Sequence, residues 1–178
     1  KVNFNTKWQW WGEKEIGVKE TILKCQQAGL KIMLKPQVWI PNGYTGDFEL
    51  SSAEEWGAFE NSYLEFVEFF IEIAEEFNVD LFCIGTEWRA FINARPKFWN
   101  SLIENSREKY SGALVYAANW DEYKRVHFWG DLDFIGIDAY FPVSKSKTPS
   151  IEESKIGWSQ WKKEIKSISD SISCCCSM

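Results

Sequence analysis

The sequence predicts an α/β fold in which parallel strands and helices alternate within a single domain, residues 1–178. Short apolar runs alternate with segments of helical spacing four times along the chain. Each apolar run is followed by polar or aromatic side chains, and no change of composition marks a domain boundary. Such alternation is typical of βα units, whose helices lie outside a parallel sheet.

The N-terminal part of the chain predicts a loop, one helix and one strand. Residues 1–15 show no periodicity and are predicted to form a loop. Apolar residues at helical spacing between Val18 and Gly29 predict a helix that the glycine ends. Residues 31–35 predict a strand that ends at Pro36, because proline has no N–H to donate to a sheet. A long loop follows, and long loops at strand ends tend to be functional.

The second helix has the clearest signal in the sequence. Ser51 with Glu54, or Ser52 with Glu55, fits a capping box at its start. Aromatic residues then repeat at helical spacing from Trp56 to Phe77. Because these rings share one face of the helix, they are predicted to belong to the core rather than to a ligand site.

Three further strands and two further helices complete the predicted sheet. The run at residues 81–84 is apolar throughout, as in a strand with both faces covered. Pro96 fits the first turn of a helix, and residues 121–130 are predicted to be a short helical or irregular piece. The strands are predicted at residues 81–84, 113–118 and 133–137, and the helices at residues 96–110 and 158–172.

All four predicted strands end in side chains suited to contact a ligand. In a parallel sheet these ends lie along one edge, where α/β proteins bind their ligands. The side chains are Gln37 and Trp39, Glu87 and Trp88, Asn119 and Trp120, and Asp138 and Tyr140.

Glu87 is the first candidate for catalysis. Hydrolysis of a glycosidic bond normally employs two carboxyl groups, one of which protonates the leaving oxygen. The adjacent indole of Trp88 is expected to exclude water and raise the pKa of Glu87, as a general acid requires. A loop-capping role for Glu87, or an ion pair with Arg89 or Arg95, fits the sequence equally well.

A second carboxyl group is available at other strand ends. Asp138 is the stronger candidate, and Asp121 and Glu13 are weaker ones. The separation of the two carboxyl groups distinguishes a retaining enzyme, at about 5 Å, from an inverting one, at about 6.5–9.5 Å.

Tryptophan is far more frequent than core packing requires in a domain of this size. The chain holds 11 tryptophans, and aromatic residues make up 17% of it. Indoles stack on the apolar faces of sugar rings, which favours a carbohydrate ligand, although packing in the core fits each ring about as well. The candidate stacking platforms are Trp39, Trp88 and Trp120, and the candidate partners of sugar hydroxyls are Gln37, Asn119 and Tyr140.

Composition argues against other classes of partner. The net charge is −6 with a pI near 5.0, and the basic residues are scattered, so no nucleic-acid interface is predicted. The single histidine, His127, and the consecutive cysteines 174–176 lack the spacing of metal ligands, so neither a metal nor another cofactor is predicted. The sequence contains no apolar run of about 18 residues, so no membrane span is predicted. No obligate protein partner is indicated.

Four blocks of sequence are specific enough to indicate a family. They lie at residues 34–39, 84–87, 116–121 and 135–142, and together they resemble glycoside hydrolase family 113 from about Trp10 to about Ile172. Members of that family are (β/α)8 barrels and mostly retaining endo-β-1,4-mannanases. The resemblance implies a partial (β/α)8 barrel, roughly strands three to six with their helices, and a β-linked oligo- or polysaccharide as the substrate.

The resemblance also implies roles for single residues. Glu87, after the fourth strand of the barrel, would be the general acid/base. The sugar groove would be lined by Trp39, Asn119, Asp138 and Tyr140, with Gln37, Trp88 and Trp120 beside them.

The sequence departs from the family pattern at both ends. The family nucleophile is a second glutamate after the seventh strand, in a Thr-Glu-hydrophobic-Gly-Tyr block that this sequence lacks. Residues 173–178 are expected to be a non-native tail. We therefore expect a truncated hydrolase that is inactive alone and poorly soluble, because open strand edges and an apolar sheet face are exposed. The alternatives are a non-catalytic carbohydrate-binding protein that uses exposed tryptophans and a structural protein without a ligand.

Overall fold

The strands form one parallel sheet, which confirms the predicted α/β fold. The computed structural model describes residues 1–175, and the side chains of residues 1–172. The sheet has the order β1-β2-β3-β4, and all three neighbouring pairs are parallel. The strands are β1 (Met33–Leu34), β2 (Leu81–Thr86), β3 (Ala113–Asn119) and β4 (Phe134–Asp138).

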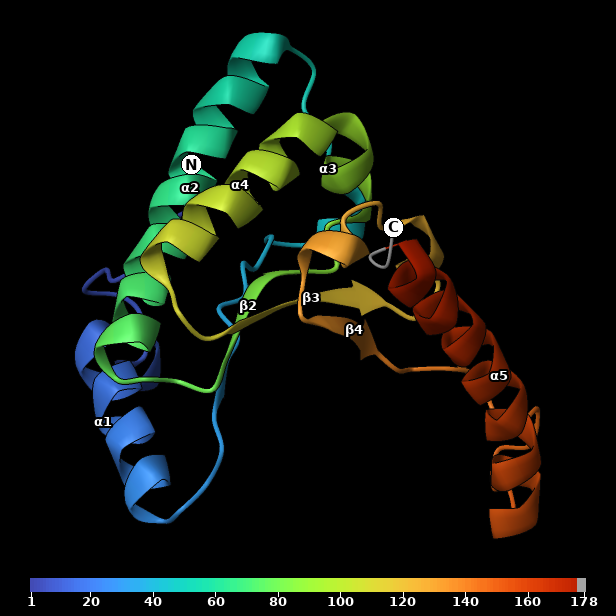
Figure 1. Ribbon diagram of the computed structural model, residues 1–178. Coiled ribbons are helices and arrows are strands. Elements are labelled where there is room, and N and C mark those ends of the chain that lie inside the picture. The colour runs from blue at the N-terminus through green and yellow to red at the C-terminus, as the bar shows by residue number, and fades with distance from the viewer. Residues whose placement is uncertain (176–178) are drawn as a thin grey trace.

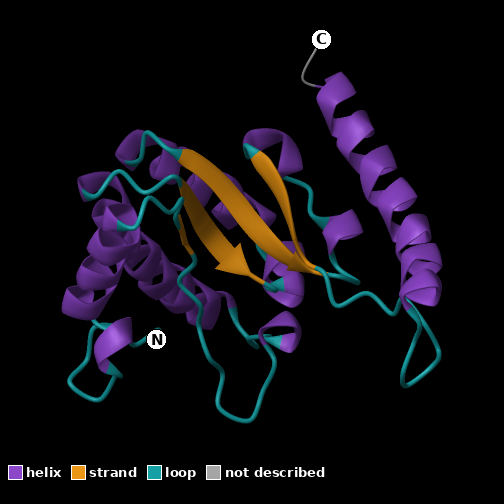
Figure 2. Cartoon of the chain, turned by 90° about the horizontal axis from the view of Figure 1, so that it is seen from below, coloured by secondary structure: helices purple, strands orange, loops and turns teal. Residues whose placement is uncertain are grey.

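The helices cover one face of this sheet. Figure 1 shows α2 and α4 side by side above the strands, α1 beside them, and α5 next to the β4 side of the sheet. In Figure 2, seen from below, the strands lie in front of the helices. The helices are α1 (Glu15–Gln27), α2 (Ala53–Glu76), α3 (Arg89–Ala94), α4 (Pro96–Lys109) and α5 (Ile151–Cys175).

The main core lies between the sheet and the helices and is rich in aromatic rings. The rings on one face of α2 are buried there, as the periodicity of the sequence predicted. They pack edge to face with rings of α3 and α4, for example Phe59 with Phe91 and Tyr63 with Phe98. Such contacts add roughly 0.5–1.5 kcal/mol each beyond the burial of area.

The opposite face of the sheet carries a much smaller cluster. Cys83, Val115 and Ala117 are buried there against Leu81. At the two outer strands, Met33 is 51% exposed and Phe134 is 56% exposed. On this face, apolar side chains are therefore buried on the central strands and exposed on the two outer strands.

Two expectations about the elements need correction. Strand β1 is limited to Met33–Leu34, whereas residues 31–35 were predicted, because the Ile32 N–H is bound by the Asp80 carboxylate (2.9 Å) and Pro36 has no N–H. Helix α3 was not predicted, since its six residues are too few to show helical periodicity.

The ends of the described chain also differ from expectation. Residues 1–15 are largely irregular, but they include a 3-10 turn at Trp11–Glu13 and the first residue of α1. Of the expected non-native tail, residues 173–175 continue α5, while residues 176–178 lie outside the described part of the chain.

Candidate active site

Glu87 occupies an unusual backbone position directly after β2. The register between β2 and β3 shifts between Cys83 and Thr86. The Glu87 N–H nevertheless donates to the Ala117 carbonyl (2.8 Å), so the residue remains tied to the sheet. Its φ of 54° lies in the left-handed region, which a residue with a side chain seldom adopts. Residues with such a strained backbone cluster at functional sites.

Gly85 allows a close approach of β2 to the aromatic core. A Cβ on Gly85 would lie 2.8 Å from the Trp99 ring and 2.9 Å from the Tyr63 hydroxyl oxygen. Only glycine therefore lets the end of β2 lie this close to these two side chains.

The carboxyl group of Glu87 has a raised pKa. Burial is the largest cause, because it disfavours the charged form, and the negative charge of Asp138 adds to it. The Tyr44 hydroxyl and the Lys35 ammonium act in the opposite direction and limit the rise in pKa. The Glu87 carboxyl group thus faces the Asp138 carboxylate, the Lys35 ammonium and the Tyr44 phenol.

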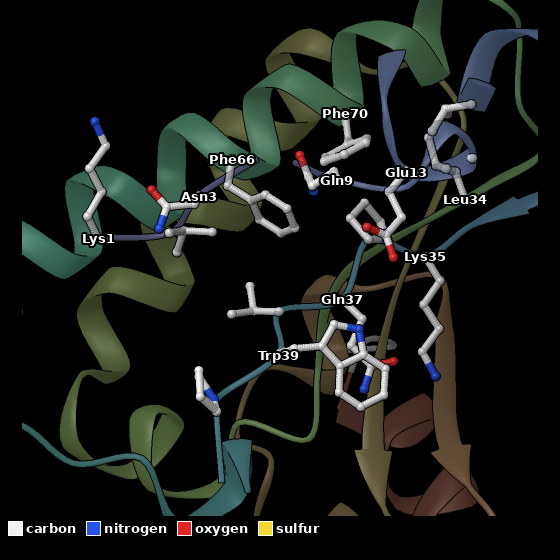
Figure 3. Close-up of a pocket in the computed structure, with 16 residues that line it drawn as sticks. Lys1, Asn3, Gln9, Glu13, Leu34, Lys35, Gln37, Trp39, Phe66 and Phe70 are labelled. Atoms are coloured by element: carbon white, nitrogen blue, oxygen red, sulfur yellow. The ribbon is translucent and has the colours of Figure 1, made fainter. Parts of the chain in front are cut away.

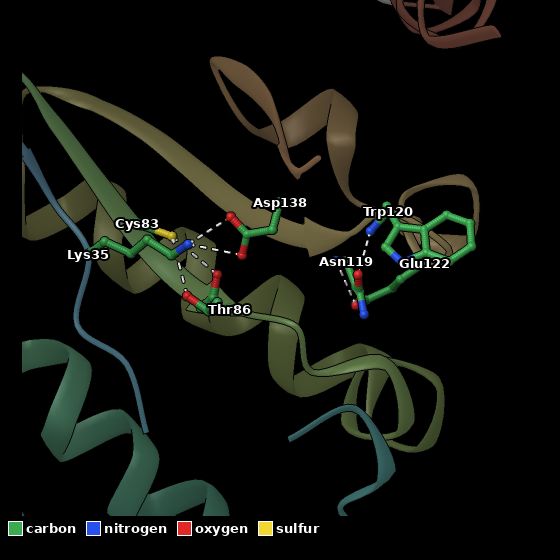
Figure 4. Close-up of polar contacts among 8 residues, drawn as sticks. Lys35, Cys83, Thr86, Asn119, Trp120, Glu122 and Asp138 are labelled. Atoms are coloured by element: carbon green, nitrogen blue, oxygen red, sulfur yellow. Dashed lines mark hydrogen bonds and ion pairs between the residues drawn. The ribbon is translucent and has the colours of Figure 1, made fainter. Parts of the chain in front are cut away.

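Lys35 and Asp138 form an ion pair across the carboxyl end of the sheet. The Lys35 Nζ lies 2.9 Å and 3.0 Å from the two oxygens of Asp138, and both side chains are 24% exposed. Figure 4 shows the lysine reaching from the β1 side towards the end of β4. A carboxylate held at both oxygens by a shielded ammonium is well oriented, but its negative charge is partly neutralised.

Tyr44 connects Asn119 with Glu87. The Asn119 Nδ2 donates to the Tyr44 hydroxyl oxygen (2.6 Å), and the Asn119 Oδ1 accepts from the Trp120 N–H (2.7 Å). Burial raises the pKa of Tyr44 to about 12, so the phenol keeps its proton at neutral pH. Since its oxygen accepts from Asn119, its proton is free to be donated to Glu87.

The expectation that the Trp88 ring is a stacking platform for a sugar is wrong. Its side chain is 1% exposed, and its Nε1–H donates to the Tyr63 hydroxyl (3.1 Å) inside the main core. Its ring packs against Phe48 and Phe59, with centroids 5.6 Å apart in both pairs. Both residues follow the end of β2, and beyond the left-handed backbone of Glu87 the Trp88 indole enters the core, while Glu87 is only half-buried.

The structural alternative for Glu87, an ion pair with a nearby arginine, is also not what is found. Arg89 pairs with Asp47 and with Asp121 (3.3 Å to the latter), and Arg95 pairs with Glu60 (2.5 Å). Arg89 thereby connects the loops that follow β1 and β3. Asp121, considered as a second catalytic carboxylate, is engaged in this pair.

The other predicted ligand contacts fall into two groups. Trp39 and Tyr140 are 79% and 78% exposed, and Gln37 is exposed. Trp120 is half-buried, and its ring lies against Phe141 and Trp161. Exposed rings are available for stacking, whereas most of the Trp120 ring is already covered.

A cavity opens beside the strand-end residues, between β1 and the N-terminal segment. Figure 3 shows Lys35, Gln37 and Trp39 on one wall, with Gln9 and Glu13 facing them. Glu87, Asn119, Asp138 and Tyr140 do not line it. Glu13, one of the two weaker carboxylate candidates, therefore lines this cavity, whereas Glu87 does not.

Three residues of the site had not been singled out from the sequence. Lys35 and Tyr44 contact the candidate carboxyl groups, and Glu122 is a carboxyl group that is only 1% exposed. The strand-end rule could have found Lys35, which directly precedes Pro36. Tyr44 lies in a long loop whose course the sequence does not define.

The described part of the chain contains neither a candidate metal site nor a candidate membrane-spanning helix. Among the side chains of residues 1–172, no group of three or more histidine, cysteine or acidic residues is placed to hold a metal ion. Among the same residues, no helix combines the length and apolar character that crossing a membrane requires.

Comparison with known proteins gives a family model and several solved structures. The model of Glycoside Hydrolase Family 113 matches residues 2–174. A GH113 β-mannanase from Alicyclobacillus acidocaldarius, solved in complex with ManMIm, superposes with a TM-score of 0.69 at 25% identity over 73% of this chain and 43% of the mannanase. A search of the curated proteins finds no match.

Two further mannanase structures match this chain to a similar extent. Two structures of a GH113 β-1,4-mannanase, one of them a complex, match with a TM-score of 0.71 at 25% identity over 87% of this chain and 48% of the mannanase. The chain therefore spans about half the length of the solved structures that it matches. The likeness confirms the predicted partial (β/α)8 barrel.

Proposed function

The chain belongs to Glycoside Hydrolase Family 113, and from this membership we propose that it is a glycoside hydrolase domain directed at β-1,4-linked mannan, with Glu87 as its general acid/base. The observation that carries the proposal is the setting of Glu87, at the carboxyl end of a central strand with a raised pKa. A general acid must hold its proton near the working pH, and a carboxyl group does so only when burial or a like charge raises its pKa.

Asp138 serves the site by orientation and charge rather than as a nucleophile. Its two oxygens are both engaged by Lys35, which lowers their readiness to attack a sugar carbon. Its negative charge raises the pKa of Glu87, and Lys35 limits that effect. We assign to this ion pair the adjustment of the proton affinity of Glu87.

The nucleophile that the family resemblance implies has no counterpart block in this sequence. We therefore propose that this chain does not hydrolyse mannan alone. Purified protein should release no reducing ends from β-mannan. Release that is abolished by Glu87→Gln would contradict this part of the proposal and would make Asp138 the partner to test.

A hybrid enzyme tests the role of Glu87 directly. Residues 34–142 would replace the matching segment of one of the solved mannanases. Glu87→Gln in the hybrid should lower mannan hydrolysis about 10²–10⁴-fold, the usual contribution of a general acid. The loss should be much smaller for an aryl mannoside whose leaving group needs no proton. Glu104→Gln, at an exposed position of α4, is the control. Equal losses on both substrates would exclude the acid role.

A non-catalytic carbohydrate-binding role is the second candidate, and the exposed rings favour it. Trp8 and Trp10 are 84% and 82% exposed, and Trp39 is 79% exposed. That role predicts manno-oligosaccharide binding, followed by tryptophan fluorescence, that survives Glu87→Ala and is lost on replacing Trp39 by alanine. It also predicts that Glu87→Gln leaves the activity of the hybrid unchanged.

A further inference from the structure

A chain of buried hydrogen bonds links the peptide N–H of Trp88, the residue after Glu87, to Tyr116 and Glu122. We propose that Tyr116 and Glu122 are positioning residues that hold the Glu87–Trp88 peptide in its left-handed turn and thereby place the Glu87 carboxyl group at the site. The inference rests on the proposed function of Glu87, whose position it explains.

The directions of the hydrogen bonds follow from the groups involved. The Trp88 N–H can only donate, so the Tyr116 hydroxyl oxygen accepts from it (2.6 Å). The proton of that hydroxyl must then point to the Glu122 Oε1 (2.6 Å). Tyr116 is 0% exposed and Glu122 is 1% exposed, so no water competes for either bond.

The second oxygen of Glu122 extends the chain to the other side of Glu87. The Glu122 Oε2 accepts from the Asn119 N–H (3.1 Å), and the Asn119 side chain donates to the Tyr44 hydroxyl (2.6 Å). Tyr44 in turn acts on the Glu87 carboxyl group. One buried carboxylate therefore fixes both the peptide that follows Glu87 and the phenol that touches its side chain.

A purely structural role explains this arrangement less well. Glu122 closes the turn after β3, where its own N–H donates to the Asn119 carbonyl (2.9 Å). A turn alone needs one acceptor for the Asn119 N–H, which a neutral asparagine or serine supplies without the cost of burying charge, whereas the carboxylate of Glu122 also accepts from Tyr116 through its other oxygen. The left-handed backbone of Glu87 is itself unfavourable and persists only where its surroundings hold it.

Several charged groups surround the two carboxyl groups and must be considered in any titration. Glu87 faces Asp138, Tyr44 and Lys35. Glu122 faces Tyr116, and the charges of Glu87 and Arg89 also act on it. Tyr116→Phe leaves all these charges unchanged, so a change in the pKa of Glu87 in that variant reports its position, whereas Glu122→Gln also removes a negative charge that acts on Glu87.

The test is the titration of Glu87 in the full chain, followed by carbon NMR and assigned with Glu87→Gln. Tyr116→Phe removes the hydroxyl that holds the Trp88 N–H without changing the shape of the ring. We expect the pKa of Glu87 to fall towards its ordinary value, because the released carboxyl group moves into water. Glu122→Gln, which cannot accept from both donors, should shift it the same way and serves as the second variant if Tyr116→Phe does not fold.

Tyr110→Phe is the matched control. Tyr110 is also buried, and its hydroxyl donates to the Val79 carbonyl (2.5 Å) at the opposite end of the sheet. Tyr110→Phe should lower the thermal midpoint about as much as Tyr116→Phe does, but it should leave the pKa of Glu87 unchanged. The proposal fails if the folded Tyr116→Phe or Glu122→Gln variant titrates at Glu87 as the unmodified chain does. An ordinary pKa of Glu87 in the unmodified chain would instead reject the acid role itself.

Discussion

At the scale of single residues, the neighbours Glu87 and Trp88 have opposite environments. Trp88 is 1% exposed in the aromatic core, whereas Glu87 faces the polar side chains at the sheet edge. The sequence predicts the direction of the pKa shift of Glu87, because a carboxyl group at the end of a buried strand is partly desolvated. It does not predict the contribution of Asp138, whose negative charge also raises the pKa.

The ion pair beside Glu87 gives opposite predictions for its two members. Asp138→Asn removes a negative charge that raises the pKa of Glu87, so the pKa should fall. Lys35→Met removes a positive charge and leaves Asp138 unpaired, so the pKa of Glu87 should rise. NMR titration of both variants checks the signs, with Lys31→Met, whose partner is Asp80, as the control. Shifts of the same sign in both variants would contradict the assignment.

The raised pKa of Glu87 also predicts a pH-dependent stability. Ionised Glu87 is disfavoured in the folded chain relative to the unfolded one, so its penalty is full above the folded pKa and absent below the ordinary value of 4.5. Glu87→Gln should therefore raise the thermal midpoint at neutral pH, by roughly 2–4 °C for each kcal/mol of penalty removed. The gain should disappear in scans below the ordinary pKa. A gain that is equal at both pH values would come from another source.

At the scale of elements, long periodic segments are predicted well and short ones are not. Helix α2 has 24 residues with one aromatic face, and its course follows from spacing alone. Strand β1 and helix α3 are decided by single contacts, such as the Asp80 carboxylate on the Ile32 N–H, that no local pattern contains. The same holds for the site. The predicted strand ends locate Glu87 and Asp138, but Tyr44 lies in a loop and Glu122 in a turn, and their contacts in the site do not follow from a local pattern.

The start of α2 resolves a choice that the sequence left open. The Ser52 side chain accepts from the Glu55 N–H (3.1 Å), and the Glu55 carboxylate accepts from the Ser52 N–H (3.1 Å). Ser52→Ala should cost about 1 kcal/mol and lower the thermal midpoint by roughly 2–4 °C. Ser51→Ala is the matched control, because Ser51 contributes its backbone N–H to the box and no cap from its side chain. Equal losses in both variants would show that the box is not the cause.

At the scale of the whole molecule, the sheet is open along both of its outer strands. Its outer strands β1 and β4 each pair on one side only, and the face away from the helices exposes Met33 and Phe134 by about half. A half-covered sheet with unpaired edges is a template for association between copies. The carboxyl ends of the strands, which present the site residues, therefore lie beside the apolar surface at which we expect copies to associate.

This arrangement predicts association that depends on concentration. Phe134→Lys and Met33→Lys place a charge on each outer strand, which blocks strand pairing between copies and hydrates the exposed face. We expect light scattering to show aggregates in the unmodified chain that diminish in each variant and most in the pair. Ile156→Lys is the control, because Ile156 is 71% exposed on α5, away from the sheet face. A monomer with a sharp, cooperative thermal transition in the unmodified chain would mean that the helix-side aromatic core alone stabilises this half of a barrel.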